Sequence, residues 1–393
     1  MDKAQDHINL GTAFSLSKRY EEAIVEFKKA LELSPKDGET LFQLGTLCTN
    51  VGIYTEAEVY YRKSLDVNPM NLNAHCKLGL LLEVQGKYAE AVLEFKKAAE
   101  LNPGDAGLYN NLGNVCSKMG NYREAVEQYE RYTAINPSNA EIYFKMGFAH
   151  EQLGQLDGAI NAYEKSLEIN PRHAAVWAIL GNACSKRGNY SQSIERYQEA
   201  LKLNPHEPEV HLKMGQAFMS LGHYDKALET FKQAREMNPN NPEVYLKLGM
   251  VYAGRGQHED AIQMYKKVME INPNDASVHN VLGYIYDRQG DLPKALEEYK
   301  AAMLLNPNDF LVLDNLGSLN YKLGFFDDAI RDFEKLIVLN PAHSDAHAKL
   351  GNIYLKKGEK QKAVEYWEKA STLDPANEIL KINIKTVKEN KVL

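Results

Sequence analysis

The sequence predicts an all-α solenoid built from repeated helix–turn–helix units, and two ladders of residues carry this prediction. Eleven glycines recur every 34 residues from Gly11 to Gly351, and eleven prolines recur every 34 residues from Pro35 to Pro375. Self-similarity at a fixed period of roughly 20–50 residues is typical of solenoids, in which each unit packs on its neighbours. A chain of 393 residues therefore needs no division into several domains of ordinary size.

Two apolar faces with helical spacing lie within each repeat when Ala4 is taken as position 1. Positions 4, 7, 8 and 11 form one face, and positions 20, 24 and 27 form the other. Position 20 is Ala in ten repeats and Ser193 in the remaining one, while position 24 is always aromatic. Small residues at positions 8 and 20 let the two helices approach closely, so we expect the ring at position 24 to fill the space beside them.

Residues at fixed positions of the repeat also predict where its two helices end. Gly stands at position 15 in ten repeats, where it can end the first helix in a left-handed conformation. The second helix must end at the residue before the proline at position 32, because that residue is forced out of the helical region. The first repeat has Lys18 at position 15, so we expect a looser turn there.

The predicted domain organisation is eleven tandem repeats followed by a capping helix. In the last segment Leu380, Ile384 and Val387 share one helical face, while Lys381, Lys385, Lys388 and Lys391 share another. A plain cap is the main interpretation, and a basic docking helix is the alternative. The predicted bounds are 4–37, 38–71, 72–105, 106–139, 140–173, 174–207, 208–241, 242–275, 276–309, 310–343 and 344–377 for the repeats, and 378–393 for the cap.

This pattern resembles the tetratricopeptide repeat family, whose W-LG-Y…A-F…P signature it follows over residues 4–377. The resemblance implies a right-handed superhelix in which the first helices of the repeats line a concave groove. It also implies that positions 2, 6, 9 and 13 point into this groove. We therefore expect a non-enzymatic protein–protein interaction scaffold that holds a segment of a partner protein in the groove.

The charges at those four positions suggest the kind of partner. Ten basic and five acidic residues occupy them, a net charge of +5, whereas the whole chain carries −7. A basic face on an acidic chain favours an acidic or carboxylate-bearing partner. Four of the lysines follow an acidic residue by four positions and could simply support their own helix. Lys118, Lys186 and Lys322 have no such partner, which makes them stronger candidates for binding.

Asparagine and apolar residues complete the predicted groove. A carboxamide can pair with both the N–H and the C=O of an extended peptide, and asparagine ladders of this kind resemble the repeat arm of O-linked N-acetylglucosamine transferases. The alternative function is therefore the substrate-recruiting arm of a larger enzyme, such as a glycosyltransferase of that type. The predicted binding residues are Asn111, Asn114, Lys118, Lys145, Phe148, Asn182, Lys186, Lys213, Met250, Tyr284, Lys322 and Asn352.

Other classes of function receive little support. The sequence has no HExxH, GxSxG, phosphate-loop or calcium-loop motif, so we expect no catalytic residues, no cofactor and no metal. A pI of about 5.9 argues against nucleic-acid binding, and RNA binding by a helical repeat stays a third hypothesis. No signal peptide or span of about 20 apolar residues is visible, so we expect a cytoplasmic protein without membrane insertion. No cap precedes residue 4, which makes that end a candidate for end-to-end self-association.

Three of the cysteines and five of the histidines also recur at fixed positions of the repeat. No two of the four cysteines form a CxxC pair, and Cys48, Cys116 and Cys184 are 68 residues apart, too far for disulfide geometry. We expect small buried hydrophobic residues in a reducing compartment. Position 4 is His in five odd-numbered repeats and Leu, Tyr or Trp in the even-numbered ones. Histidines two repeats apart cannot share one ion, so a packing role is expected.

Overall fold

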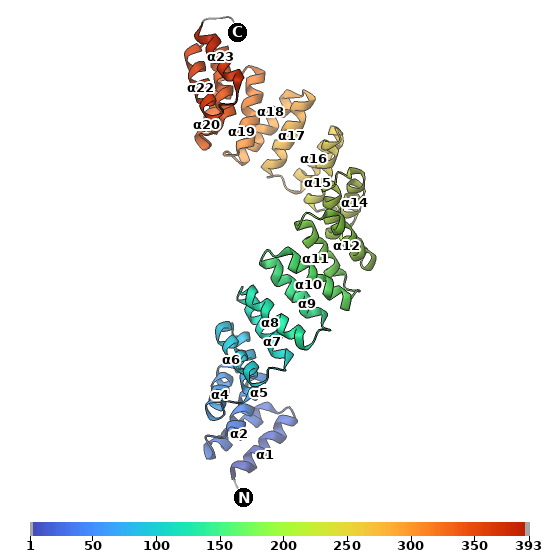
Figure 1. Ribbon diagram of the computed structural model, residues 1–393, viewed down its shortest axis with the longest axis vertical. Helices are drawn as coiled ribbons and strands as arrows, with labels where there is room; N and C mark the ends of the chain where they lie inside the picture. Colours follow the sequence, from blue (N-terminus) through green and yellow to red (C-terminus); the bar gives the residue numbers. More distant parts are fainter. Residues whose placement is uncertain (1–2, 390–393) are drawn as a thin grey trace. The chain divides into compact units, whose positions relative to one another are not determined.

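The computed structural model describes residues 3–389, which form 23 α-helices and no strand (Figure 1). The first helices of the repeats are α1 (Lys3–Leu16), α3 (Gly38–Asn50), α5 (Leu72–Val84), α7 (Ala106–Lys118), α9 (Ala140–Gln152), α11 (Ala174–Lys186), α13 (Pro208–Ser220), α15 (Pro242–Gly254), α17 (Ala276–Gln289), α19 (Phe310–Leu323) and α21 (Ser344–Lys356). The second helices are α2 (Tyr20–Leu33), α4 (Tyr54–Val67), α6 (Tyr88–Leu101), α8 (Tyr122–Ile135), α10 (Leu156–Ile169), α12 (Tyr190–Leu203), α14 (Tyr224–Met237), α16 (His258–Ile271), α18 (Leu292–Leu305), α20 (Phe326–Leu339) and α22 (Lys360–Leu373). The last helix is α23 (Glu378–Lys388).

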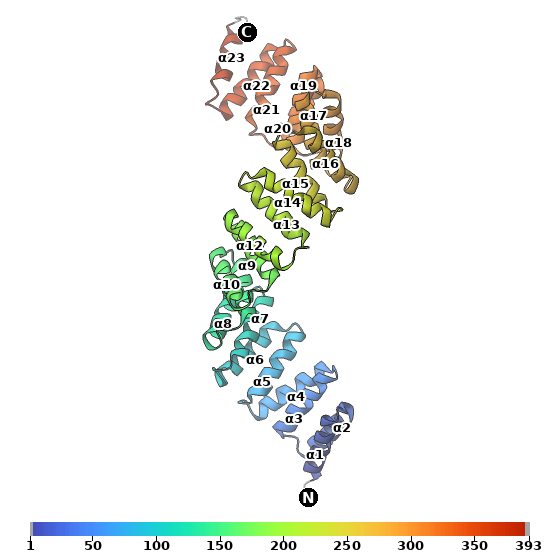
Figure 2. The same ribbon diagram turned by 90° about the vertical axis from the view of Figure 1, so that its right-hand side faces the viewer.

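The helices belong to two compact units, Met1–His206 and Glu207–Leu393. Within each unit, consecutive helices pair as antiparallel hairpins (Figures 1 and 2). After the opening hairpin of a unit, each first helix also packs on the second helix of the repeat before it. This neighbour-to-neighbour packing confirms the predicted all-α repeat fold.

The turn between the two helices of a repeat depends on a left-handed residue at position 15. The ten glycines there have φ between 71° and 87°, a region that costs an L-residue about 1–2 kcal/mol. Lys18 takes the same place in repeat 1 with φ 58°. The next amide, Arg19 N–H, donates to the Phe14 carbonyl at 2.9 Å, which is the bond that follows the glycine in the other repeats. The looser turn expected for repeat 1 is therefore wrong, because Lys18 adopts the strained conformation instead.

A polar residue at position 34 starts most of the first helices. The Asp37 carboxylate accepts from the N–H groups of Glu39 and Thr40, and the Asn71 side chain accepts from Ala74 N–H. Such side chains satisfy amides that have no partner within the helix. The proline two residues earlier ends the preceding helix, so three residues stop one helix and start the next.

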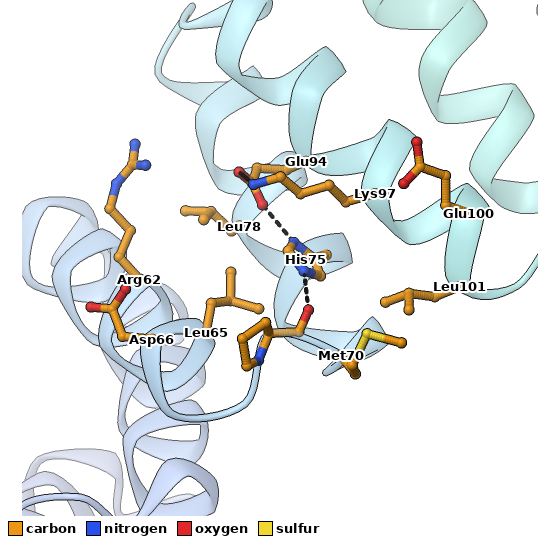
Figure 3. A pocket seen from close by; sticks show the side chains of 11 residues that line it. Arg62, Leu65, Asp66, Met70, His75, Leu78, Glu94, Lys97, Glu100 and Leu101 are labelled. Carbon is orange, nitrogen blue, oxygen red and sulfur yellow. Dashed lines mark hydrogen bonds and ion pairs between the residues drawn. The ribbon is translucent and has the colours of Figure 1, made fainter.

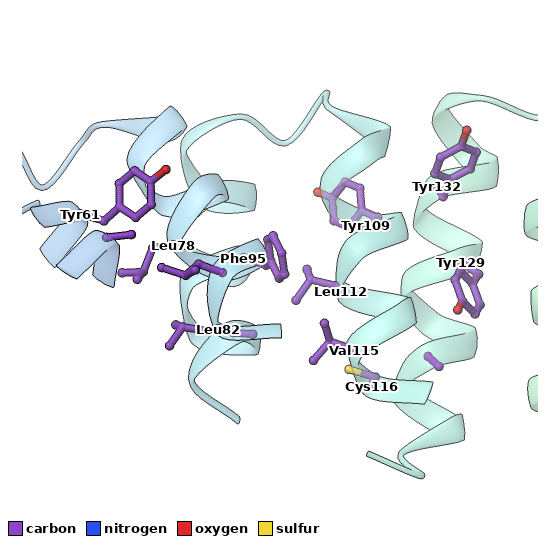
Figure 4. Close-up of a cluster of buried hydrophobic side chains, with 14 of the residues drawn as sticks. Tyr61, Leu78, Leu82, Phe95, Tyr109, Leu112, Val115, Cys116, Tyr129 and Tyr132 are labelled. Atoms are coloured by element: carbon purple, nitrogen blue, oxygen red, sulfur yellow. The ribbon is translucent and has the colours of Figure 1, made fainter. Parts of the chain in front are cut away.

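The glycine at position 8 and the ring at position 24 form the centre of each hairpin. A Cβ added to Gly113 would lie 2.4 Å from the Tyr129 ring, and one added to Gly181 would lie 2.6 Å from the Tyr197 ring. Only a residue without a side chain lets the ring lie this close to the first helix. The rings join the buried leucines of successive repeats into a continuous core (Figure 4), as shown by Tyr61, Leu78, Leu82, Phe95, Leu112 and Tyr129.

Helix α23 packs on α22 in the second unit. Its residues Leu380 and Val387 are buried, and Ile384 packs against the same hydrophobic cluster. When the repeat numbering is continued, Lys385 stands at position 8, where every full repeat has glycine. A side chain there would block the ring of a further second helix. The predicted cap residue Lys391 lies outside the described residues.

The cysteines are free thiols, and three of the four are fully packed. Burial raises the pKa of Cys48 to about 11 and that of Cys116 to about 12, so both stay protonated at neutral pH. Cys76 differs from the prediction because it is only half-buried. Among the described helices, none is both long enough and apolar enough to cross a membrane.

Candidate functional site

The predicted binding residues lie on one side of the first helices, at positions 6, 9 and 13, which together with position 2 we call the first-helix face. The first unit contributes members from α7, α9 and α11, and the second unit contributes members from α13, α15, α17, α19 and α21. The exposed members are Lys118, Phe148, Lys186, Met250, Tyr284, Lys322 and Asn352, and the half-buried members are Asn111, Asn114, Lys145, Asn182 and Lys213.

Three of the four lysines at position 13, Lys118, Lys186 and Lys322, are paired, contrary to the prediction that they lack partners. Each Nζ reaches a carboxylate at position 12 of the preceding first helix, at 2.8 Å for Lys118–Glu83, 2.6 Å for Lys186–Glu151 and 2.9 Å for Lys322–Asp287. The hydrogen bond to Glu83 raises the pKa of Lys118. The prediction was wrong because the partner lies 35 residues earlier, outside the four-residue spacing that was searched. The lysine side chains stay more than half exposed.

Two of the five lysines at position 6, Lys145 and Lys349, also bridge neighbouring repeats. Lys145 Nζ lies 2.8 Å from Glu141 Oε1 and 3.2 Å from Asn110 Oδ1, the latter on the preceding first helix. Lys349 Nζ lies 2.8 Å from carboxylate oxygens of both Asp314 and Asp345. The predicted pairs within one helix therefore form at these two places, and each lysine has a second partner from the repeat before it.

These contacts change the charge of the first-helix face. Four carboxylates at positions 5 and 12 pair with its lysines, namely those of Glu83, Glu151, Asp287 and Asp314. Counting them lowers the net charge of the face from +5 to +1. Positions 2, 6, 9 and 13 alone therefore overstate the basic charge of the face, since they omit the acidic partners that lie beside them.

The asparagines at position 9 bind the central ring of their own repeat. Tyr129 Oη donates to Asn114 Oδ1 at 3.1 Å, Tyr197 Oη donates to Asn182 Oδ1 at 2.7 Å, and Trp367 Nε1 donates to Asn352 Oδ1 at 3.1 Å. Burial raises the pKa of Tyr197 to about 12, so its hydroxyl keeps the proton that it donates. These three side-chain oxygens were predicted to bind a peptide, but they already accept hydrogen bonds from rings of the hairpin core.

Several large apolar side chains of the first-helix face are exposed. Leu80, Val84 and Phe148 are exposed in the first unit, and Met250 and Tyr284 are exposed on the adjacent first helices α15 and α17 of the second. Phe148 is 41% exposed, and its ring meets Tyr122 edge-on with centroids 6.1 Å apart. These residues stand at positions 9 and 13, in the places where other repeats have Asn or Lys.

At position 4, histidine and the larger rings make the same contact, with the carbonyl of the proline six residues earlier. His75 Nε2 lies 2.9 Å from the Pro69 carbonyl, six residues earlier, and Tyr109, Trp177 and Tyr245 donate to the equivalent proline carbonyls. In three repeats the other histidine nitrogen meets a glutamate of the second helix at 2.6–2.7 Å. Within residues 3–389 no three His, Cys, Asp or Glu side chains gather in a way that could hold a metal ion.

Comparison with known families matches nearly the whole chain. Family models described as tetratricopeptide repeat match residues 4–37, 38–71, 138–206, 185–251 and 315–378, and a model described as TPR repeat matches residues 84–120, 113–154, 251–290 and 283–324. The chain belongs to the tetratricopeptide repeat family. Tetratricopeptide repeats build protein-interaction scaffolds, and this chain is a scaffold of that kind. The comparison with curated protein sequences gives no match.

Two solved structures share the fold. The C-terminal part of a TPR repeat-containing protein from Cytophaga hutchinsonii is 21% identical with a TM-score of 0.54, and the similarity covers 61% of this chain and 98% of that chain. A chain in the structure of Naa15/Naa10 bound to HypK-THB is 16% identical with a TM-score of 0.51, over 98% of this chain and 66% of that chain. At these identities the similarity concerns the fold alone.

Proposed function

We propose that the protein is a non-enzymatic scaffold whose first-helix face binds a segment of a partner protein. The observation that carries the proposal is the set of exposed large apolar side chains on that face, with Phe148 beside Tyr122 in the first unit and Met250 with Tyr284 in the second. Phe148, Met250 and Tyr284 keep 41–52% of their surface exposed, so the packing between repeats leaves apolar surface on this face. Exposed apolar side chains within a polar surround are typical of protein-binding surfaces.

The paired charges favour a partner whose apolar side chains supply most of the affinity. Lys118, Lys186 and Lys322 are each satisfied by a carboxylate at 2.6–2.9 Å, so an acidic partner gains little at these three lysines unless it displaces that carboxylate. Exposed ion pairs contribute only about 0–1 kcal/mol, whereas a buried aromatic anchor contributes more to binding. We therefore expect a segment with apolar anchors and mixed charge rather than a strongly acidic one.

The contacts also bear on the second function predicted from the sequence, the recruiting arm of a larger enzyme. That prediction depended on asparagines that would hold a peptide backbone. Asn114, Asn182 and Asn352 each accept a hydrogen bond from a ring of their own repeat. This hydrogen bond within the repeat accounts for the presence of asparagine at these three positions, and no bound peptide is needed to explain it.

The test uses peptides selected on the protein itself. A displayed library of random peptides is selected on the immobilised full chain, and the affinity of each enriched peptide is measured by fluorescence anisotropy for the wild type and for Phe148→Asn. Asn already stands at position 9 in repeats 4, 6 and 11, so this variant is expected to fold. We expect at least about tenfold weaker binding for peptides that bind the first unit, the loss typical of a central aromatic anchor.

Two further variants complete the design. Tyr284→Asn makes the same change in the second unit, and it should weaken a different subset of the peptides. Glu127→Gln changes an exposed residue of α8 away from the first-helix face, and it should leave every affinity unchanged. If no peptide is enriched, or if enriched peptides bind both Asn variants as tightly as the wild type, the first-helix face is not the binding surface.

A further inference from the structure

A second candidate site lies away from the first-helix face, in a pocket of about 370 Å³ lined by α4, α5 and α6 (Figure 3). The volume falls in the range of small-ligand sites. Leu65, Leu78 and Leu101 give the pocket an apolar lining. Arg62 and Lys97 bring cations to it, and Asp66, Glu94 and Glu100 bring carboxylates; Lys97 Nζ lies 3.0 Å from Glu94 Oε1. One wall is the imidazole of His75, held by Glu94 Oε2 at 2.6 Å and by the Pro69 carbonyl at 2.9 Å.

The repeats themselves indicate what fits this space. Position 4 is His75 in repeat 3, whereas it is Tyr109 in repeat 4 and Trp177 in repeat 6. The two larger side chains make the same contact as His75, since Tyr109 Oη donates to the Pro103 carbonyl at 3.2 Å and Trp177 Nε1 donates to the Pro171 carbonyl at 2.9 Å. An imidazole is smaller than a phenol or an indole. Repeat 3 therefore has room where other repeats place a larger aromatic ring.

A cation is already in position for such a ring. In repeat 4 the Arg131 guanidinium lies 5.9 Å from the centre of the Tyr109 ring, and in repeat 6 the Arg196 guanidinium lies 5.6 Å from the Trp177 ring. Lys97 occupies in repeat 3 the position that Arg131 occupies in repeat 4, and it lines the pocket. A ring in the pocket would meet Lys97 as Tyr109 meets Arg131, an attractive arrangement for an aromatic face.

The surroundings of the pocket extend the apolar surface. Met70 lines the pocket and is 70% exposed, and a thioether makes favourable contacts with aromatic rings. Val59 and Leu93 are 48% and 59% exposed. They lie about one helical turn from Arg62 and Lys97 on the same helices, α4 and α6. A segment that lies across these two helices could thus bury a ring in the pocket and smaller apolar side chains beside it.

We propose that this pocket binds an aromatic side chain, with indole preferred, from a protein segment lying across α4 and α6. The indole N–H shares the Pro69 carbonyl, whose oxygen has a second lone pair. The ring lies between Lys97 and the thioether of Met70. Because the pocket does not include the first-helix face, the scaffold has two separate surfaces for partner segments.

The test titrates N-acetyl-tryptophanamide into the full chain labelled with carbon-13 at the methionine methyl groups. Met70 is the reporter, and its resonance is assigned with Met70→Leu. We expect a saturable shift of that resonance with a Kd on the order of a millimolar, as suits so small a ligand. N-acetyl-alaninamide, which lacks the ring, should not shift it at the same concentrations. An unmoved Met70 resonance during the tryptophan titration overturns the proposal.

Two variants separate binding in the pocket from a surface effect. His75→Tyr with Glu94→Gln gives repeat 3 the residues that repeat 4 has at the same positions, Tyr109 and Gln128, so it should fold with the pocket filled and bind at least tenfold more weakly. Lys97→Gln removes the cation and should weaken binding about two- to fivefold. Wild-type affinity in either folded variant contradicts the assignment. Phe148→Asn should leave this titration unchanged, which keeps the outcome independent of the proposed function.

Discussion

Adding one methyl group at Gly113 tests the packing that defines the repeat. The Cβ of Gly113→Ala would lie 2.4 Å from the Tyr129 ring, whereas the Cβ of Gly11→Ala would lie 3.2 Å from the Phe27 ring. Carbon atoms in ordinary contact are about 3.5–4.0 Å apart. The Tyr129 ring must therefore move by about 1 Å within a packed core, while Phe27 needs to move only a few tenths of an ångström.

Two opposing terms decide the sign of each effect. Overpacking of a core costs about 1–3 kcal/mol, and replacing Gly with Ala in a helix stabilises it by about 1 kcal/mol. The net expectation is that Gly113→Ala lowers the free energy of unfolding by up to about 2 kcal/mol. Gly11→Ala should leave it nearly unchanged or raise it slightly. Both glycines belong to the first unit.

Hydrogen exchange measured by mass spectrometry is the suitable assay, because repeat arrays lose stability locally before the whole chain unfolds. Peptides from α7 and α8 should exchange faster in Gly113→Ala, while peptides from α1 and α2 should be unchanged in Gly11→Ala. In a Tyr129→Ala background the ring is absent, so Gly113→Ala should become stabilising. Equal effects at the two glycines, or a cost at Gly113 that persists without Tyr129, would refute the reasoning.

Three further predictions address the turn, a half-buried carboxyl and the inter-repeat ion pairs. Lys18→Gly should raise the free energy of unfolding of repeat 1 by about 1 kcal/mol, because it relieves a left-handed lysine; local hydrogen exchange that is not slowed in α1 and α2 would contradict this. Burial raises the pKa of Asp332 from 3.8 to about 6, so the folded second unit takes up a proton between these values, and its stability should rise as the pH falls through 6 and be lost as the pH rises through 6. Full burial would make the change about 3 kcal/mol and partial exposure reduces it to about 1–2 kcal/mol; urea unfolding of Asp332→Asn at pH 5 and pH 7.5 should show this component of the pH dependence gone. A double-mutant cycle for Lys118→Met and Glu83→Gln should give a coupling of about 0.2–1 kcal/mol that weakens at high salt, whereas no coupling at low salt would mean that the pair does not form.

Much of the fold could be predicted from the sequence because packing residues repeat at a fixed spacing. The glycine at position 8, the ring at position 24 and the proline at position 32 each act within one hairpin, so their roles follow from helical geometry. Lys18 shows the limit of such reasoning. A residue type predicts what a position prefers, but Lys18 adopts a left-handed φ of 58° at the place where the other ten repeats have glycine, so the hairpin imposes that conformation on it.

The candidate site was harder to predict because its contacts join different repeats. The partners of Lys118 and Lys186 lie 35 residues earlier, and only the stacking of two first helices brings them together. The same offset was visible in the sequence, since positions 12 and 13 of neighbouring repeats carry opposite charges. The pocket beside His75 was missed for a different reason. From the sequence, histidine at position 4 was interpreted as a packing residue. The imidazole of His75 is smaller than the phenol of Tyr109, and the space that it leaves is evident only when repeats 3 and 4 are compared in three dimensions.

The central claim, that a partner segment lies along the first-helix face, is tested most directly by photo-crosslinking. p-Benzoylphenylalanine is placed at Phe148 or at Glu127, and each full-length protein is irradiated with one of the selected peptides that binds the first unit. Both sites are exposed, but only Phe148 belongs to the first-helix face. The account predicts a crosslink from position 148 and none from position 127. A crosslink from position 127 with none from position 148 would contradict it.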